Sequence, residues 1–593
     1  MASPSGCDLN KPHEVFNRSK LRRAAVLLFV LAGLAACADR NTAHESLPAS
    51  SLQVEKSNES NRPNFLVIVA DDLGYTDLGV YGSEIATPNL DALARDGVLF
   101  TDFYSAPNCS PARSMLLSGT DSHLAGLGNM AETLAVNQEG HPGYEGYLNF
   151  NVASLAEVLH DAGYHTYMTG KWHLGLTSQT GPAARGFERS FAMLEGGAGH
   201  FSNMLALIGP GQAKFTEDGQ QLHHLSRDFY SSRSYAEKMI DYLKSNEDDG
   251  KPFFAYLAFQ APHWPLQAPE ETIAEQRGHY DDGYDVLHER RVSRLSEVGI
   301  IARGTESFPR LPNEPPWNSL SEEQKRVEAR KMEIYAAMVV EMDRYAGEVV
   351  DYLKASNQFN DTFIFFMSDN GAEGHRLDRS LDQLAQWVEQ CCDNSYENMG
   401  AAASYIWYGP NWGRAGVGPW RMFKGFTFEG GIKVPAFVHY PKLPARGTVE
   451  RSFLTVMDVM PTLLQMADVE EPGPRYKGRD IVPMQGRSML ALLEGKASFV
   501  HDDDYVVGWE LFGKRGLRRG EWKLVYQPYH KDSISNLDRT ESDTWLLYNL
   551  EQDPAEVHDV SAEHPEMLRE MIALWQDYAR NNGVIIPDTH GSY

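Results

Sequence analysis

Cysteine is scarce in this chain of 593 residues, and the few cysteines present exclude several kinds of site. The five stand at positions 7, 37, 109, 391 and 392. No two have the C-x-x-C spacing that is typical of zinc ribbons and dithiol redox motifs. The adjacent Cys391 and Cys392 do not make a normal disulfide framework, so we expect them to be free thiols in a loop. Cys37 and Cys109 each stand in a sequence motif of their own.

Basic residues are also few relative to acidic ones. Lys and Arg together number 54 against 81 for Asp and Glu, which gives a formal net charge of −27. A surface with this charge repels polyanions, so nucleic-acid binding is excluded as a function. If the substrate is an anion, a local patch of cations must bind it. Internal repeats and low-complexity tracts are absent, and the length predicts two or more domains with an ordinary globular composition.

Long apolar runs are missing except near the N-terminus. Residues 24–36 are apolar and follow Arg18, Lys20, Arg22 and Arg23, but the run is too short to span a bilayer as a mature helix. It ends in Leu34-Ala35-Ala36-Cys37, which resembles a bacterial lipobox and implies lipidation of Cys37. The alternative is a plain secretory signal cleaved near Ala36. We therefore expect residues 1–37 to be a signal peptide with a lipobox and residues 38–61 to be a flexible tether. Both alternatives predict an exported, periplasmic protein, and the lipobox adds an anchor to a membrane.

From Pro63 onward, strand-like and helix-like segments alternate, which predicts an α/β architecture. Asn64–Ala70 (NFLVIVA) is typical of a strand that is buried on both faces. Further strands are expected at Val98–Phe103, His165–Thr169, Pro252–Phe259 and Thr362–Ser368, and helices at Pro88–Asp96, Val152–Ala162, Ser234–Ser245 and Glu322–Ser356. We assign residues 62–500 to one domain with a large, mixed, mostly parallel sheet flanked by helices.

The last part of the chain has a different pattern. Short strands are expected at Tyr505–Phe512, Gly516–Arg519, Trp522–Tyr526 and Trp545–Asn549, separated by Gly, Asp and Pro turns and followed by a helix at Pro565–Arg580. This predicts a small C-terminal domain, residues 501–593, with an antiparallel sheet and a helix.

Polar residues follow four of the predicted buried strands. Asp71-Asp72, Gly170-Lys171-Trp172-His173, Ala261-Pro262-His263 and Asp369-Asn370-Gly371 each come directly after a strand or close to its end. Taken singly, such residues are usually turns, helix caps or structural histidines. In open α/β sheets, however, ligands bind beyond the carboxyl ends of the strands. The four segments together therefore predict one shared site.

The residue types indicate the chemistry of this site. Asp71, Asp72, Asp369 and Asn370 offer hard oxygen ligands, which suit Ca²⁺ or Mg²⁺ better than zinc. Three carboxylates would overcompensate a divalent ion, so nearby cations are expected, and the candidates are Arg113, Lys171 and Lys424. Cys109 precedes a helix predicted over Pro111–Leu117, where a helix N-terminus favours negative charge. A thiolate nucleophile fits that position, and so does a cysteine packed under the helix.

Several motifs resemble the formylglycine-dependent sulfatases of the alkaline-phosphatase-like superfamily, above all the bacterial arylsulfatases of the Pseudomonas type. Cys109-Ser110-Pro111-Ala112-Arg113 resembles the C-x-P-x-R signature, and Gly163–Thr166 with Gly170–His173 resembles the second signature. Asn108 and Thr169 depart from the signatures without changing a chemical group. The similarity covers nearly everything from Arg62 onward and includes Asp71–Gly74, Asp369–Gly371, Ala261–Pro269, Ser404–Pro410, Lys424–Pro435 and Gly508–Arg519.

The resemblance implies a role for each matched residue. Cys109 would be oxidised to formylglycine by a maturation enzyme, and its hydrate would attack the sulfur of a small sulfate ester with help from Asp369. Asp71, Asp72, Asp369, Asn370 and the formylglycine would hold a metal, Ca²⁺ rather than Mg²⁺. Arg113 and Lys171 would position the hydrate, and Lys171, His263 and Lys424 would hold the sulfate. His263, with Lys424, would protonate the leaving group, and His173 would accept the proton when sulfate departs.

Two other functions remain open from the sequence. The first is a phosphonate or phosphodiester hydrolase of the same superfamily, which shares C-x-P-x-R. The second is a surface lipoprotein that uses the fold only for binding, although every matched catalytic position here is filled. The connection Glu373–Trp420 contains Tyr405, Trp407, Tyr408, Trp412 and Trp420, which either line a pocket for an aryl group or pack in the core. Whether the natural substrate is an aryl, alkyl or carbohydrate sulfate is not determined by motifs.

Overall fold

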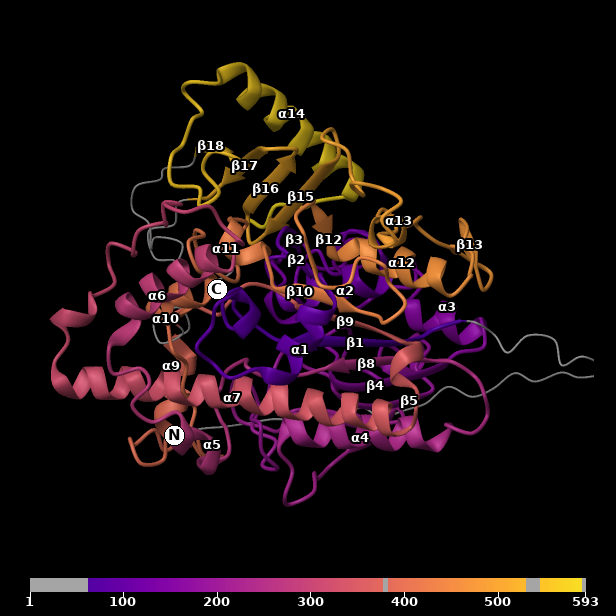
Figure 1. Ribbon diagram of the computed structural model, residues 1–593, viewed down its shortest axis with the longest axis horizontal. Coiled ribbons are helices and arrows are strands. Elements are labelled where there is room, and N and C mark those ends of the chain that lie inside the picture. The colour runs from indigo at the N-terminus through magenta and orange to yellow at the C-terminus, as the bar shows by residue number, and fades with distance from the viewer. Residues whose placement is uncertain (1–61, 377–381, 529–543, 589–593) are drawn as a thin grey trace, which may run out of the picture. The chain divides into compact units, whose positions relative to one another are not determined.

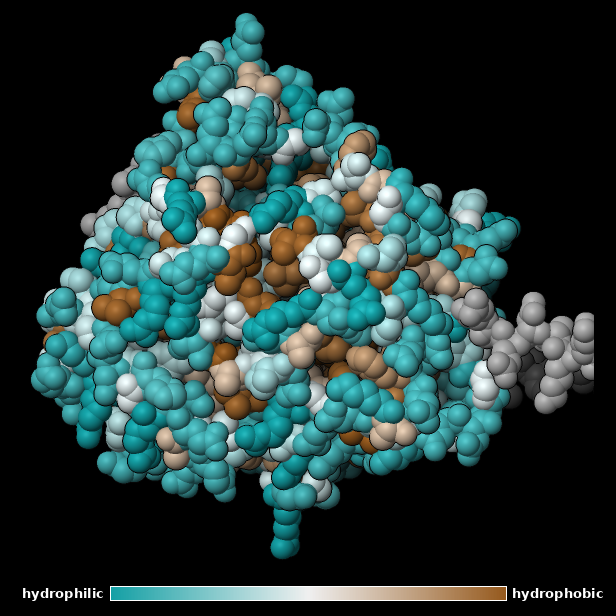
Figure 2. Space-filling view, viewed as in Figure 1, coloured by the Kyte–Doolittle hydropathy of each residue, from teal (hydrophilic) through white to brown (hydrophobic). Residues whose placement is uncertain are grey.

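The computed structural model describes residues 62–376, 382–528 and 544–588, which belong to one compact unit, Glu59–Tyr593 (Figure 1). The predicted signal peptide, lipobox and tether lie outside the described residues. Within the described residues, no helix combines the length and the apolar character that crossing a membrane requires. The face seen in Figure 2 is mostly hydrophilic with small, separate apolar patches, as the acidic composition leads one to expect.

A ten-stranded sheet forms the centre of this unit. Its strand order is β11-β2-β10-β9-β1-β8-β4-β5-β6-β7. The pairs from β9 through β5 are all parallel, whereas β10 and β6 pair antiparallel with their neighbours, so the sheet is mixed and mostly parallel in its middle. The strands are β1 (Asn64–Ala70), β2 (Val98–Phe100), β4 (His165–Lys171), β5 (Arg189–Met193), β6 (Phe215–Glu217), β7 (Gln220–Leu222), β8 (Phe253–Ala258), β9 (Thr362–Ser368), β10 (Ala436–His439) and β11 (Thr448–Glu450).

The central strands are buried on both faces, which accounts for their continuous apolar sequences. Successive side chains of a strand point to opposite faces, so Leu66 and Ile68 of β1 enter one core while Phe65 and Val67 enter the other. The first core also contains residues of α1 (Pro88–Asp96), α4 (Ser231–Ser245) and α7 (Glu322–Ala355), and the second contains residues of α2 (Cys109–Ser118), α3 (Leu155–Asp161) and α12 (Val459–Met466). In Figure 1, α4 and α7 run along the same side of the sheet.

The C-terminal part is a separate antiparallel sheet with the order β15-β16-β17-β18. Its strands are β15 (Val506–Leu511), β16 (Lys514–Arg519), β17 (Trp522–Tyr526) and β18 (Trp545–Asn549), and α14 (Pro565–Asn582) packs on one face through Met571 and Trp575 (Figure 1). The predicted fold class is thereby confirmed, from the large mixed sheet with flanking helices to the small antiparallel sheet with its helix. The boundary between residues 500 and 501 stays a prediction.

Two segments differ from the expectation. The predicted strand Val98–Phe103 is divided into β2 and β3 (Phe103–Tyr104), because β3 leaves the large sheet and pairs with β12 (Leu454–Thr455). The expected connection Glu373–Trp420 contains α9 (Asp382–Cys391) and α10 (Pro410–Val417). The remaining elements are α5 (Glu270–Glu275), α6 (Gly283–Glu297), α11 (Glu429–Ile432), α13 (Leu490–Leu493), β13 (Arg475–Tyr476) and β14 (Arg479–Asp480).

Candidate active site

The two acidic segments meet because their strands are neighbours in register. β1 and β9 are parallel, with Ala70 opposite Ser368, so Asp71-Asp72 and Asp369-Asn370 emerge side by side. The backbone N–H of Asp72 donates to Asp369 Oδ1 at 3.2 Å, and Asn370 Nδ2 donates to Asp72 Oδ1 at 2.7 Å. Gly371 completes this turn, since a Cβ at this position would lie 1.9 Å from the carbonyl oxygen of Gly430. The four predicted oxygen ligands are therefore together and buried.

Cys109 faces these carboxylates from the first residue of α2. The side chain of Asn108 caps the helix by accepting from the Cys109 N–H, and the helix begins two residues earlier than predicted. Cys109 Sγ lies 3.3 Å from Asp71 Oδ1 and 3.7 Å from Asp72 Oδ1, and the residue is 1% exposed. Burial raises the pKa of the thiol well above its ordinary value, and Asp369 raises it further. The surroundings therefore do not favour a thiolate, although the thiol points into the cluster of polar side chains.

Three buried cations pair with the three carboxylates. Lys171 Nζ donates to both oxygens of Asp71 at 2.7 Å, and Arg113 bonds Asp369 Oδ2 through Nε at 2.9 Å and a terminal nitrogen at 2.7 Å. Lys424 Nζ donates to Asp72 Oδ2 at 2.9 Å. These are the cations expected from the sequence, and each is paired with one carboxylate, so the cluster by itself has no excess of positive charge.

The three aspartates differ in pKa although each has a cationic partner. Burial raises the pKa of Asp71 to about 7 although Lys171 and Arg113 lower it, and burial also raises the pKa of Asp72. Burial opposes ionisation of Asp369 as well, but Arg113, Lys171 and Lys424 together bring its pKa to about 2. Asp71 and Asp72 are thus incompletely compensated, and additional positive charge beside them would be favourable.

Two histidines flank the cluster. His263 Nε2 lies 3.5 Å from Asp72 Oδ2, and its Nδ1 is 2.5 Å from the carbonyl oxygen of Trp264. Burial lowers the pKa of His263 well below its ordinary value, and Lys424 and Lys171 add to this. His173 Nε2 lies 2.9 Å from Glu132 Oε1, while its buried Nδ1 has no hydrogen-bond partner among the described residues. If Nε2 carries the proton, Nδ1 is a free base.

The backbone is unusual at two of these positions. Asp72 has a φ of 66° and His173 a φ of 54°, in the left-handed region that residues with a Cβ rarely adopt. Such conformations cost free energy and cluster at functional sites, where the surrounding structure holds them. The backbone and the side chains therefore indicate the same site.

The donor set fits a divalent cation. Ligand atoms of Asp71, Asp72, Cys109 and His263 lie within 4.8 Å of one another. Asn370 Oδ1 is buried and has no hydrogen-bond partner among the described residues, so an oxygen ligand is also available. His263 belongs to this geometric group although it was not predicted as a ligand, and Asp369 bonds Arg113 as well as the Asp72 N–H. Carboxylate and amide oxygens suit Ca²⁺ or Mg²⁺.

Two carboxylates at the site were missed by the sequence reasoning. Glu132 pairs with His173, and Glu373 lies 3.4 Å from Lys424 Nζ and accepts from Trp264 Nε1 at 3.3 Å. Burial opposes ionisation of Glu373, but His375 and Lys424 bring its pKa to about 2. Glu373 follows Asp369 by four residues, a proximity that could have drawn attention to it. Glu132 lies in a segment without a motif, and nothing in the sequence signals it.

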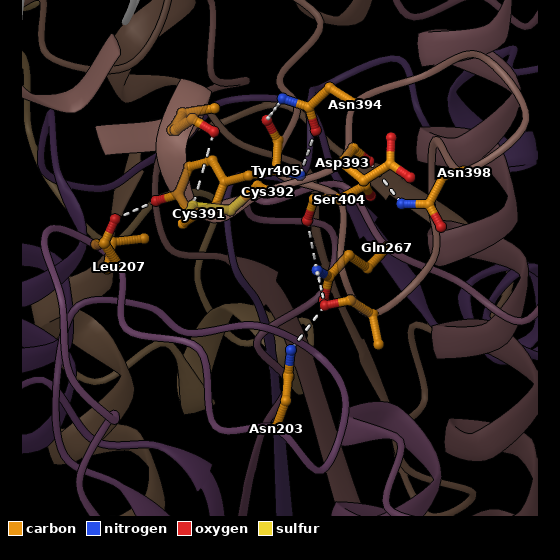
Figure 3. Close-up of a disulfide and its surroundings, with 12 residues drawn as sticks. Asn203, Leu207, Gln267, Cys391, Cys392, Asp393, Asn394, Asn398, Ser404 and Tyr405 are labelled. Atoms are coloured by element: carbon orange, nitrogen blue, oxygen red, sulfur yellow. Dashed lines mark hydrogen bonds between the residues drawn. A yellow bond between two sulfur atoms is a disulfide. The ribbon is translucent and has the colours of Figure 1, made fainter. Parts of the chain in front are cut away.

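The expectation for Cys391 and Cys392 was wrong. They form a disulfide at the end of α9 instead of remaining as loop thiols (Figure 3). No normal disulfide framework was expected from an adjacent pair, but the structure joins the two sulfur atoms. The segment that follows continues to Tyr405, whose hydroxyl donates to the carbonyl oxygen of Leu207 (Figure 3).

The aromatic cluster of this region mainly packs in the core. Tyr405, Tyr408, Trp412 and Trp420 are at most 4% exposed and belong to the same apolar core as α7, and Trp407 packs against it. Tyr408 stacks on Tyr335 of α7 with ring centroids 4.6 Å apart. Of the two predicted roles, the structure therefore favours packing.

Known proteins resemble this chain along most of its length. The family model described as "Sulfatase" matches residues 63–469, and the one described as "N-sulphoglucosamine sulphohydrolase, C-terminal" matches residues 418–577. An uncharacterized sulfatase of Schizosaccharomyces pombe is 45% identical over 546 residues, which are 89% of this chain and 96% of that protein. An arylsulfatase of Klebsiella aerogenes is 37% identical over 447 residues, which are 74% of this chain and 93% of that protein.

A solved structure shows a similar arrangement. The protein Ps i-CgsB, in complex with k-i-k-neocarrahexaose, superposes with a TM-score of 0.61 at 25% sequence identity. The superposition covers 89% of this chain and 95% of that one.

Proposed function

From the premise that this chain belongs to the sulfatase family and is a sulfuric ester hydrolase, we propose that its nucleophile is the hydrate of a formylglycine made from Cys109. One observation carries the proposal: the Cys109 side chain points at the carboxylates of Asp71 and Asp72. A buried cation is bonded to each of these two carboxylates and to that of Asp369. A hydrated aldehyde supplies two hydroxyls, one to attack sulfur and one whose loss of a proton expels sulfate by C–O cleavage. An ordinary alcohol could not perform the second step.

A divalent metal is the second part of the proposal. Asp71, Asp72, Asp369 and Asn370, together with the modified residue 109, would hold it, and His263 stands within the same group. Its oxygen-rich donors favour Ca²⁺, with Mg²⁺ the less suitable ion. When bound, the metal would supply Lewis-acid polarisation of the nucleophile and of the sulfate. Two observations support this assignment. Asn370 Oδ1 is buried without a hydrogen-bond partner among the described residues, and the pKa values of Asp71 and Asp72 are raised.

The cations would bind the sulfate and orient the nucleophile. Arg113 and Lys171 position the hydrate, and Asp369 helps remove the proton of the attacking hydroxyl. Lys171, Lys424 and His263 hold the sulfate oxygens, where positive charge stabilises the charge that spreads over the transferring sulfuryl group. Because all of these side chains are buried, the interactions act in a medium where they are stronger than in water.

The two histidines would move protons at opposite ends of the reaction. His263, with Lys424, protonates the oxygen of the leaving alcohol or phenol. Burial and the lysines disfavour its charged form, but the negative sulfate entering between them favours it again. His173 removes a proton from the second hydroxyl through Nδ1, and Glu132 positions it by accepting from Nε2. Glu132 is therefore a positioning residue in this scheme.

Three forms of the protein test the proposal. We expect the wild type, produced with a formylglycine-generating enzyme, to hydrolyse an aryl sulfate and to yield a residue-109 peptide with the mass of formylglycine. Cys109→Ala should lose at least about 10⁴-fold in kcat at unchanged thermal stability. Chelation followed by Ca²⁺ should remove and restore the activity of the modified enzyme. Full activity of Cys109→Ala, beside a wild type that carries the modification, would refute the assignment.

A phosphonate or phosphodiester hydrolase is the alternative function. The segments Ala261–Pro265 and Glu429–Pro435 and the pair Asp369-Asn370 favour the sulfate ester. We expect the modified enzyme to turn over 4-nitrophenyl sulfate with a higher kcat/KM than 4-nitrophenyl phenylphosphonate. The reverse ranking would support the alternative.

The maturation enzyme and the export route complete the proposal. Since Cys109 is buried in the folded protein, its oxidation must precede folding, and we propose that a formylglycine-generating enzyme acts on the unfolded chain. We propose further that Cys37 is lipidated after export, on the basis of Leu34-Ala35-Ala36-Cys37. Intact mass and membrane fractionation of the wild type and Cys37→Ser would test the anchor, which predicts a diacylglycerol adduct only in the wild type.

A further inference from the structure

A small pocket opens beside His173. Its volume is about 240 Å³, below the roughly 300–1,000 Å³ usual for sites of drug-sized ligands. The side chains of Leu176, Leu194, Leu207 and Ile208 line it, and its polar groups are His173, Glu132 and Glu195. Among the described residues that line it, none is a lysine or an arginine. The pocket is thus compact, largely apolar and negative in charge.

Two adjacent glycines connect this pocket with the candidate active site. A Cβ at Gly196 would lie 2.8 Å from Cε1 of His173, and one at Gly197 would lie 2.9 Å from Cδ1 of Leu207 and 3.1 Å from Cε1 of His263. The backbone of this segment therefore contacts both histidines and the pocket wall. An ester whose sulfate lies among Lys171, Lys424 and His263 would extend its organic group past this segment.

The wall that carries Leu207 is held in place by distant segments. The carbonyl oxygen of Leu207 accepts from the hydroxyl of Tyr405, and Asn203 Nδ2 donates to the carbonyl oxygen of Ala402 at 2.7 Å (Figure 3). Both hydrogen bonds therefore tie the wall to the chain that follows the disulfide. A wall fixed in this way can discriminate between organic groups by their shape and charge.

We propose that this pocket receives the organic group of the sulfate ester, that it selects compact uncharged apolar groups, and that Glu195 excludes groups that carry a second negative charge. The proposal rests on the function proposed above and names the substrate class of that site. Sulfated sugars with a carboxylate or a second sulfate near the ester are poor substrates on this view, and simple aryl and alkyl sulfates are good ones.

The charges of the pocket support the selection. Glu132 is compensated by His173, whereas Glu195 accepts from the backbone N–H of Lys214 at 2.8 Å and forms no ion pair with any described residue that lines the pocket. Burial raises the pKa of Glu195 although the backbone N–H and the charge of Lys214 lower it, and Glu132 adds a small further rise. A pocket that already disfavours the ionised form of its own carboxyl group disfavours a second anion for the same reason.

The apolar side chains of the pocket support the proposed preference for apolar organic groups. Leu176 is 38% and Ile208 is 50% exposed, which leaves apolar surface at the pocket available to a ligand. Covering it with an apolar organic group removes this surface from water, which favours binding. A hydroxyl-rich sugar would cover it without comparable gain and would lose water from its own polar groups.

A matched pair of esters tests the exclusion of charge. 4-Carbamoylphenyl sulfate and 4-carboxyphenyl sulfate have the same shape and differ by one charge. We expect modified wild-type enzyme to prefer the carbamoyl ester in kcat/KM by at least about tenfold. Glu195→Gln should reduce this preference at least about threefold, because kcat/KM for the carboxy ester rises relative to that for the carbamoyl ester. Equal turnover of both esters by the wild type would overturn the exclusion of charge.

A second comparison tests the apolar contact. Ile208→Ser should lower kcat/KM for phenyl sulfate by about tenfold and should lower kcat/KM for glucose 6-sulfate less. Val449→Ser, which alters another exposed apolar residue that is not part of the pocket, is the matched control and should change neither. A wild type that prefers glucose 6-sulfate to phenyl sulfate would overturn the assignment of substrate class while leaving the proposed function intact. If modified enzyme hydrolyses no sulfate ester, the proposed function itself fails.

Discussion

Two clusters of buried charges in this protein differ in whether the polar atoms beside them have hydrogen-bond partners. The active-site cluster consists of Asp71, Asp72, Asp369, Arg113, Lys171 and Lys424. The junction cluster consists of Glu429 on α11, Lys523 on β17 and Glu556, and it connects the C-terminal sheet with the part of the chain next to the active site. Both clusters carry acidic groups whose pKa is raised by burial, Asp71 and Glu556 each to about 7.

In the junction cluster every carboxylate oxygen has a partner. Lys523 Nζ lies 2.8 Å from Glu429 Oε1 and 3.3 Å from Glu556 Oε1. The remaining oxygens accept from the hydroxyl of Tyr104 at 2.5 Å and from the backbone N–H of Glu429 at 2.7 Å. A buried polar network that is fully bonded in this way holds its parts in one arrangement.

The carboxylate oxygens of the active-site cluster have partners too, but polar atoms next to the cluster do not. Asn370 Oδ1 and His173 Nδ1 have no hydrogen-bond partner among the described residues, and Cys109 points at carboxylates that are already bonded to cations. Unsatisfied buried atoms cost free energy unless a ligand bonds them. The comparison teaches that a buried charge cluster alone does not indicate catalysis here. The unpartnered atoms beside it do, together with the left-handed backbone of Asp72 and His173.

The largest expected effect is on stability, at the junction. Lys523→Met leaves two buried carboxylates without their shared cation, and we expect a loss of about 3–5 kcal/mol in the free energy of unfolding. The kcat of the remaining folded enzyme should not change. Chemical denaturation and active-site titration measure the two quantities. Lys496→Met, which alters an exposed lysine, is the control and should cost no more than about 1 kcal/mol.

The next effect is on activity, at the active site. Asp72→Asn should lower kcat/KM by about 10²–10³-fold, because a ligand of the proposed metal and a partner of Lys424 is lost. Since burial disfavours the charged form of Asp72, the free energy of unfolding should stay within about 1 kcal/mol of the wild type. If Asp72→Asn unfolds as readily as Lys523→Met, the contrast between the clusters is wrong.

A smaller loss is expected for the positioning residue. Glu132→Leu removes the acceptor that keeps the proton on Nε2 of His173, so kcat should fall by about 10–100-fold. Glu132→Gln keeps an acceptor oxygen and should lose less. The pH dependence of kcat distinguishes this role from a structural one. Only loss of the pairing with His173 would shift the pH at which kcat rises or falls. An unchanged profile and rate for Glu132→Leu would contradict the assignment.

The smallest effect concerns the pH dependence of stability at the junction. The pKa of Glu556 is raised from 4.5 to about 7, so the folded protein binds more protons than the unfolded chain between these values. The stability that this group contributes is therefore present below pH 4.5 and is lost as the pH rises through about 7. Glu556→Gln has no carboxyl group to titrate at this position, so it does not lose this stability. Between pH 4.5 and about 7, the difference in free energy of unfolding between Glu556→Gln and the wild type should therefore shift by more than about 1 kcal/mol in favour of the variant. Parallel curves for the two proteins would contradict the raised pKa.

Much of the fold and the site could be predicted from local patterns. The apolar runs of β1 and β9 specified buried strands, and the rule that ligands bind at the carboxyl ends of such strands brought Asp71, Asp72, Asp369 and Asn370 together correctly. Lys171 was expected just after the strand that begins at His165, and it is the last residue of β4. The bridge between Cys391 and Cys392 was not foreseen, because the adjacency of two cysteines does not tell whether their sulfur atoms are joined.

The sequence by itself determined the family, the residue proposed as nucleophile and the order of the groups that surround it, because these depend on short motifs and on strand periodicity. Only the tertiary structure decided which carboxylate supports His173 and which side chains form the pocket beside it. Glu132 comes from a short 3-10 helix, and Leu176, Glu195 and Ile208 come from loops; all four residue types are common on any surface. Their function follows from proximity, and proximity between loops is set by the packing of the whole sheet.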